Sequence, residues 1–166
     1  MFEPKLIKPD YRRAEREAIG LVNSSGIFEP PVNPVDIART LNVQVKFVTF
    51  SGESEGVSGL YDPSGNAILV NQQEPGVRQT FTIAHELGHK VLHEEWAKSD
   101  AYKVLWRDQR RQTDRWEQEA NTFAANLLMP RQMVDLYRYL PLSVVAKIFA
   151  VSETVAGYRL KHLYGL

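Results

Sequence analysis

The chain has 166 residues, 43% of them hydrophobic, which is enough for one domain with its own core. It contains no cysteine, which excludes disulfide bonds and thiolate ligands, so any metal must be bound by His, Asp or Glu. Twenty basic and twenty acidic residues cancel, so no overall charge favours nucleic acid or an anionic membrane.

Residues 1–9 contain no apolar run of the length that a signal peptide needs, and no later segment has the length and apolarity of a membrane span. The lack of cysteine agrees with a reducing compartment. We therefore expect a cytoplasmic protein with no membrane partner.

The N-terminal third predicts two helices with recognisable caps. Asp10 can cap a helix over residues 11–22, in which apolar residues form one stripe among charged ones. Asn33 can cap a second, short helix that has Pro34 at its first position and runs to about Leu41.

Three strands are predicted next. Residues 43–50 alternate between apolar and polar side chains, which is typical of a half-buried strand. Residues 57–61 and 67–71 form the two arms of a hairpin around the turn Asp62-Pro-Ser-Gly-Asn66. The sequence therefore predicts a small antiparallel or mixed sheet.

The rest of the chain is predicted to be helical, apart from a solvated, charged connector over residues 99–112. The first helix begins near Thr80 and continues past His93 toward Trp96. Thr113 or Asp114 caps the next, which stops at Pro130. The further predicted helices cover residues 131–139, 142–151 and 152–163. The fold class is thus α+β in a single domain, residues 1–166, with an N-terminal helical segment (1–33), a core (34–130) and C-terminal helices (131–166).

The motif His85-Glu-Leu-Gly-His89 carries the predicted chemistry. Two histidines four residues apart lie on one face of a helix, where both rings can bind one zinc ion. Glu86 can take a proton from a water whose pKa the metal has lowered. The alternative is a core helix whose histidines are satisfied by backbone carbonyls, but a metal site accounts for all three residues together.

Glu117 is the best candidate for a third ligand. Small residues lie three, four and seven positions after it, so its helix could approach another closely. Asn121, one turn later, could hydrogen-bond a ligand histidine and fix its tautomer. Glu119 should point to a different face, and the alternative for Glu117 is an ordinary first-turn glutamate favoured by the helix dipole.

Two stretches, Phe81-Thr-Ile-Ala-His-Glu-Leu-Gly-His89 with His93, and Glu117-Gln-Glu-Ala-Asn-Thr-Phe-Ala-Ala-Asn-Leu-Leu-Met-Pro130, closely resemble the ImmA/IrrE-type metallopeptidases. The resemblance implies a compact zincin-like domain in which His85, His89 and Glu117 bind one zinc ion and Glu86 activates water. It also implies a substrate strand beside the cleft, with which an extended substrate could pair. That strand consists of Ala67, Ile68, Leu69, Val70 and Asn71.

Members of this family are typically bacterial or phage regulators that cleave a helix-turn-helix repressor and so relieve repression. The resemblance therefore implies a zinc metalloendopeptidase with such a repressor as its substrate. His93 is expected to order the core or to support a ligand. The group that stabilises the oxyanion stays open among Tyr61, His93, Tyr158 and His162.

Two other functions remain open. One is a non-catalytic regulator or toxin–antitoxin component that uses the same fold to bind a partner. The other is a DNA-binding module, because residues 144–152 and 155–163 have the rhythm of a helix-turn-helix, with Arg159, Lys161 and His162 on its second helix. We favour a core-covering or partner-docking role for these helices over groove reading.

Overall fold

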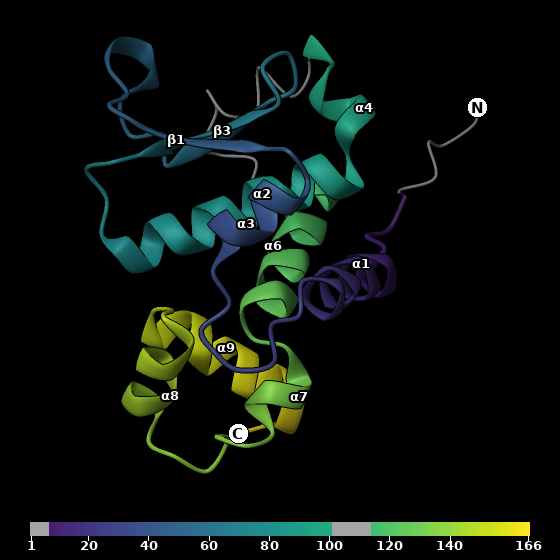
Figure 1. Cartoon of the computed structure of the whole chain (residues 1–166), viewed down its shortest axis with the longest axis vertical. Coiled ribbons are helices and arrows are strands. Elements are labelled where there is room, and N and C mark those ends of the chain that lie inside the picture. Colours follow the sequence, from purple (N-terminus) through teal and green to yellow (C-terminus); the bar gives the residue numbers. More distant parts are fainter. Residues whose placement is uncertain (1–6, 101–113) are drawn as a thin grey trace, which may run out of the picture.

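A computed structural model describes residues 7–100 and 114–166 of the chain. A three-stranded sheet lies on one side of helix α3 (Gly76–Leu92), and helices α1 (Tyr11–Ser24) and α6 (Arg115–Leu128) pack on its other side (Figure 1). The helices that follow α6 gather at the end of the molecule opposite the sheet (Figure 1). The predicted α+β class, with a small sheet and a helical C-terminal half, is confirmed.

The sheet is mixed, with β3 (Ala67–Asn71) in the centre. β1 (Gln44–Val48) is parallel to β3 and pairs Gln44 with Ala67. β2 (Gly59–Asp62) is antiparallel to β3 and pairs Gly59 with Val70. The segment between β1 and β2 contains one short 3-10 turn, Gly52–Ser54. β1 and β2, which follow each other along the chain, therefore lie on opposite sides of β3.

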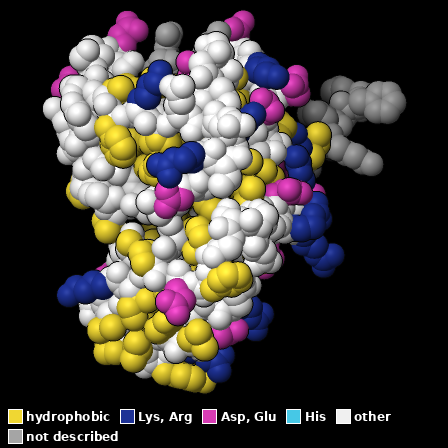
Figure 2. All heavy atoms as spheres, in the orientation of Figure 1, with side chains coloured by type: hydrophobic (Ala, Val, Ile, Leu, Met, Phe, Trp, Pro, Cys, Tyr) yellow, Lys and Arg dark blue, Asp and Glu magenta, His cyan; other side chains and the backbone are white. Residues whose placement is uncertain are grey.

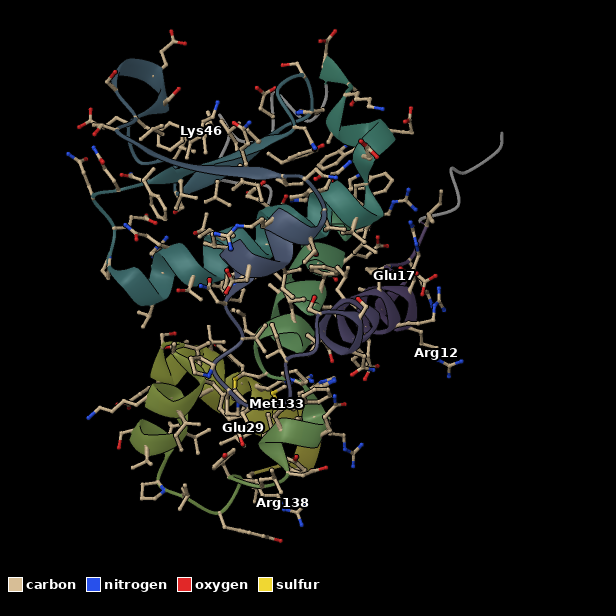
Figure 3. All side chains as sticks on the ribbon, viewed as in Figure 1. Arg12, Glu17, Glu29, Lys46, Met133 and Arg138 are labelled. Atoms are coloured by element: carbon tan, nitrogen blue, oxygen red, sulfur yellow. The ribbon has the colours of Figure 1, made fainter. Side chains whose placement is uncertain are left out.

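Both predicted N-terminal caps are present. The carboxylate of Asp10 accepts the Arg13 N–H at the start of α1, and Asn33 accepts the Val35 N–H at the start of α2 (Pro34–Thr40). Ala14, Ala18 and Val22 are the buried residues of α1, and small side chains there allow α1 to pack closely on α6. Arg12 points away from α6 on the outer side of α1 (Figure 3).

Helix α3 begins and ends earlier than predicted. It starts directly after Pro75, whose φ of −56° is already suited to a helix start, and it ends at Leu92. His93 leaves helical geometry, with φ −132° and ψ 27°, and a separate short helix α4 (Glu94–Ala97) follows. The break turns the chain at His93, and the His93 ring is almost fully buried.

Two of the helices after α6, namely α7 and α8, are shorter than predicted. Asp114 caps α6 through the Trp116 N–H, and α6 stops two residues before Pro130. The segment predicted as a helix over residues 131–139 forms α7 (Arg131–Val134) and then turns. α8 (Leu142–Phe149) ends at Ala150, which has a φ of +52°, and Ser152 caps α9 (Glu153–Tyr164).

The α8–turn–α9 pair has helix-turn-helix connectivity, but Arg159 is not available to DNA. Its guanidinium donates to the Met129 carbonyl at 3.0 Å and to Asn126 Oδ1 at 2.7 Å, and only 4% of the residue is exposed. Arg159 therefore ties α9 to the end of α6, which agrees with a core-covering role for these helices.

The surface at this end of the molecule is apolar. Figure 2 shows hydrophobic side chains gathered over the helical end. The exposed large apolar residues of this region include Leu136, Tyr139, Leu140, Leu142, Val144 and Tyr158. None of the described helices is long and apolar enough to cross a membrane. Most of the predicted connector, from residue 101 onward, lies outside the described residues.

Candidate metal centre

The close approach of α3 and α6 builds the centre. Gly88 of α3 lies directly against α6, where a Cβ atom would be 3.1 Å from Ala120 Cα and 3.2 Å from Phe123 Cδ1. With glycine on one helix and alanine on the other, the two backbones come close enough for Glu117, one turn before Ala120, to reach the histidines of α3.

Three side chains from the two helices converge on one point. His85 Nε2 lies 3.1 Å from Glu117 Oε2, His89 Nε2 lies 3.1 Å from Glu117 Oε1, and the two Nε2 atoms are 3.1 Å apart. Ligand atoms at the corners of a tetrahedron about 2.0–2.1 Å from zinc would be about 3.3 Å from one another. The nitrogen and oxygen donors present therefore fit a zinc ion, and the three residues are those predicted as ligands.

Glu86 is the other carboxylate near the two histidines. The nearest donor atoms of His85, Glu86 and His89 all lie within 4.8 Å of one another, so this set could also be considered as a ligand group. We favour Glu117 as the third donor because its two oxygens each lie 3.1 Å from a histidine nitrogen. Glu86 is 7% exposed and lines the cleft beside the donors, which is where a proton acceptor would be needed.

The electrostatics of the metal-free centre reflect these contacts. Burial opposes protonation of His85, but the Glu117 and Glu86 carboxylates outweigh it and raise the pKa of His85 to about 9. Burial also opposes ionisation of Glu117, yet both histidines hold the pKa of its carboxyl well below the usual range. At neutral pH a protonated His85 ring therefore faces an ionised Glu117 carboxylate, and a cation bound here would take the place of that proton.

Each of the two histidines also has a contact at its Nδ1 atom. His85 Nδ1 lies 2.9 Å from Asn121 Oδ1, on the exposed side of the centre. His89 Nδ1 lies 3.1 Å from His93 Nδ1, and His93 Nε2 lies 2.7 Å from Glu119 Oε2. The structure thus brings Asn121 and His93, the two predicted supporting residues, within hydrogen-bonding distance of the two histidines. Burial lowers the pKa of His93 to about 4, even though Glu119 acts in the opposite direction.

Sequence reasoning missed Glu119. It does point away from the three donors, as predicted, but it is 5% exposed and holds His93 and the backbone N–H of Asp10. The sequence offered two signals: Glu119 follows Glu117 by two residues, and His93 follows His89 by four. Neither signal specifies contact between the two side chains, because Glu119 lies on α6 and His93 lies just after the end of α3.

A cleft of about 700 Å³ opens in front of the donors. The walls of the cleft are formed by the end of the segment that precedes β2, by the start of β2, by α3, by α6 and by the start of α9. The lining residues that matter below are Ser58, Gly59, His85, Glu86, Glu117 and Asn121.

The prediction that substrate pairs with residues 67–71 is wrong for this sheet. β3 is the central strand, and its two edges are already hydrogen-bonded to β1 and β2. An added strand needs a free edge. In the described sheet, the edge beside the cleft belongs to β2, since Ser58 and Gly59 line the cleft.

None of the four candidates for oxyanion stabilisation is among the described residues that line the cleft. Tyr61 is 1% exposed, and its hydroxyl donates to Asn66 Oδ1 at 3.2 Å. His93 is buried behind His89. Tyr158 and His162 line a second hollow, which shares Phe81, Asn121, Thr154 and Val155 with the cleft.

Comparison with known proteins gives a consistent result. A family model described as the IrrE N-terminal-like domain, a peptidase family, matches residues 40–161. The chain is 38% identical over 109 residues to the "Radiation response metalloprotease IrrE" of Deinococcus deserti, covering 61% of this chain and 38% of that protein. It is 33% identical over 108 residues to the "Uncharacterized immunity region protein 2" of Bacillus phage phi105, covering 64% of each. The chain therefore matches less than two thirds of the length of these relatives.

A solved structure titled "Mycobacterium tuberculosis transcriptional regulator" is also similar, with a TM-score of 0.65 and 17% sequence identity. The match covers 90% of this chain and 46% of that one. At this level of identity, the likeness shows a shared fold.

Proposed function

Since the chain belongs to the metallopeptidase family of the IrrE N-terminal-like domain, we propose that it is a zinc-dependent endopeptidase that cleaves a helix-turn-helix transcriptional repressor. His85, His89 and Glu117 are the proposed zinc ligands, and Glu86 is the proposed general base.

The observation that carries this proposal is the convergence of His85 Nε2, His89 Nε2 and Glu117 on one point, with each contact at 3.1 Å. Three protein ligands and one open position are the usual arrangement of a catalytic zinc ion. The absence of cysteine leaves nitrogen and oxygen as the donors, which suits zinc in a hydrolytic enzyme.

A zinc ion bound here would act as a Lewis acid and would lower the pKa of water at its open position. Glu86 lines the same cleft and takes the proton of the attacking water. The same carboxyl group then returns this proton to the amine that leaves. Asn121 and His93 keep the two ligand rings oriented while this happens, because each lies about 3 Å from an Nδ1 atom.

The substrate backbone pairs with the outer edge of β2. Ser58 and Gly59 line the cleft, and in the described sheet this edge has no neighbouring strand. Gly59 also keeps β2 close to α3, since a Cβ there would lie 2.5 Å from Thr82 Cγ2. A substrate strand added at this edge would pass the metal centre in an extended conformation.

A repressor is the proposed substrate class because the sequence resembles regulators that cleave such proteins. Similarity to a phage protein named for an immunity region supports a repressor as the substrate. Similarity to a metalloprotease named for the radiation response supports it as well. The second candidate function is a partner-binding regulator on the same fold, which needs the metal centre for shape but not for hydrolysis.

The test compares the zinc-loaded wild type with the Glu86→Gln variant. Each is incubated with the total protein of the source cells, and new N-termini are labelled and identified by mass spectrometry. We expect a new N-terminus inside a helix-turn-helix protein with the wild type and none with Glu86→Gln, which should still bind zinc. Regulation that persists in cells carrying Glu86→Gln would instead support the partner-binding regulator.

A further inference from the structure

A continuous chain of hydrogen bonds runs from the backbone of the N-terminal segment to the metal centre. The Asp10 N–H donates to Glu119 Oε1 at 2.8 Å. Glu119 Oε2 lies 2.7 Å from His93 Nε2, and His93 Nδ1 lies 3.1 Å from His89 Nδ1. His89 Nε2 is the atom that faces Glu117 and His85.

The direction of each bond follows from what each group can donate. A backbone N–H is always a donor, so Glu119 accepts at Oε1, and its carboxylate can also accept at Oε2. The His93 proton is then on Nε2, which leaves Nδ1 of a neutral His93 ring as an acceptor. His89 must therefore donate from Nδ1, and a neutral His89 ring has a bare Nε2 lone pair facing the donors.

We propose that Glu119 is a positioning residue that acts through His93 to hold a proton of His89 on Nδ1, so that the Nε2 atom of His89 faces the metal. This rests on the proposed function, because it assigns to Glu119 a role in the same zinc site. The two ligand histidines differ in this respect: His85 is held by one amide on the exposed side, whereas His89 is held by a buried chain of two side chains.

Packing alone would be the simpler role for His93. Its ring contacts two indoles, with centroid distances of 4.9 Å to Trp116 and 6.0 Å to Trp96, and these indoles stack on each other at 5.1 Å. Packing needs only an apolar side chain of similar volume, however. The positioning role needs a group that accepts from His89 and donates to Glu119 at the same time.

This difference defines the test. His93→Gln keeps one acceptor and one donor in the amide group, whereas His93→Leu keeps volume without either. Zinc affinity is measured by competition with a chromogenic chelator, and the stability of each metal-free variant is measured by thermal unfolding. We expect His93→Leu and Glu119→Leu to bind zinc about 10–100-fold more weakly than the wild type. His93→Gln should recover most of this loss.

The double variant His93→Leu/Glu119→Leu should bind zinc no more weakly than either single variant, because both changes break the same chain. Equal losses in His93→Gln and His93→Leu would overturn the proposal, as would wild-type affinity in His93→Leu.

A second measurement has a wild-type arm, whose result does not depend on how any variant folds. Nitrogen-15 NMR of the metal-free wild type reports which ring nitrogen of His89 carries the proton. We expect a protonated Nδ1 in the wild type and a mixture of tautomers in Glu119→Gln. A His89 ring with no proton on Nδ1 in the wild type would overturn the inference even if zinc binds. Conversely, the wild type could fail to bind zinc while His89 has the expected tautomer. That result would contradict the proposed function but would leave the positioning role of Glu119.

Discussion

Glu117 differs from the other glutamates near the centre because each of its oxygens contacts one of the two proposed ligand histidines. Each oxygen lies 3.1 Å from an Nε2 atom, and the side chain is 25% exposed. Glu86 lines the cleft, and Glu119 stands behind His93. Three glutamates within 34 positions of one another thus have three different roles in the proposed site, set by which atom each one faces.

The Glu117→Gln substitution tests the third ligand directly. The amide keeps the shape of the side chain but removes its charge and one oxygen. We expect zinc affinity to fall by more than about 100-fold, since the loss of an outer partner alone costs about 10–100-fold. Zinc content after dialysis against a weak chelator measures this. Glu95→Gln is the matched control, because the Glu95 side chain is 89% exposed and should leave zinc content unchanged. A zinc-loaded Glu117→Gln protein would contradict the assignment.

Zinc binding should depend on pH through His85. The neighbouring carboxylates raise the pKa of this ring to about 9 in the metal-free protein, so at pH 7.5 it holds a proton that zinc must displace. Lower pH favours the protonated ring, and the apparent zinc affinity should therefore fall by up to about tenfold per pH unit below pH 9. Calorimetry in two buffers with different ionisation enthalpies would measure about one proton released per zinc at pH 7.5. Release of no proton would contradict this protonation state.

Helices α3 and α6 matter as a pair because the proposed ligands are divided between them. The two histidines come from α3 and the carboxylate from α6. Their separation is set at Gly88, where a Cβ would lie 3.1 Å from the α6 backbone. The geometry of the centre is therefore a consequence of helix packing.

The Gly88→Val substitution should force the two helices apart. Overpacking of this kind costs about 1–3 kcal/mol of folding free energy, and zinc affinity should fall as Glu117 moves away from the histidines. Urea unfolding and chelator competition measure the two effects. Gly20→Ala in α1 is the control, since nothing lies within 4 Å of a Cβ there. This change should raise stability by roughly 0.5–1 kcal/mol and leave zinc affinity unchanged. Equal zinc affinity in both variants would show that the helix spacing does not set the site.

The helices and strands could be predicted because their signals lie within short stretches of the sequence. The contacts between these elements were harder to predict. Asp10 and Asn33 could be identified as caps because a cap involves neighbouring residues only. The central position of β3 in the sheet could not be predicted, because strand order depends on how the segment between β1 and β2 crosses the sheet. The distance between Glu117 and the histidines could be anticipated from the small residues on α6. The contact between His93 and Glu119 could not be anticipated, because it also depends on the turn of the chain at His93.

At the scale of the whole molecule, a metal bound at the centre would join the part that carries the sheet and α3 to the part built on α1 and α6 (Figure 1). Free zinc at 100 times its dissociation constant should stabilise the folded chain by about 2.7 kcal/mol. For a chain of this size, that corresponds to a rise in Tm of roughly 5–10 °C. Thermal unfolding with zinc and with EDTA measures this rise, and Glu117→Gln should not show it. An equal rise in that variant would indicate zinc binding elsewhere.

The bond from the Asp10 N–H to Glu119 has a consequence for how the loaded state could be observed. Its donor and acceptor residues are 109 positions apart, and the acceptor is the last side chain of the network behind His89. If zinc immobilises His89, we expect this network to immobilise Glu119 as well, so that the Asp10 amide hydrogen exchanges with deuterium in the solvent more slowly. A peptide from the beginning of the chain, which contributes no donor to the metal, would thus record the occupancy of a centre built by α3 and α6.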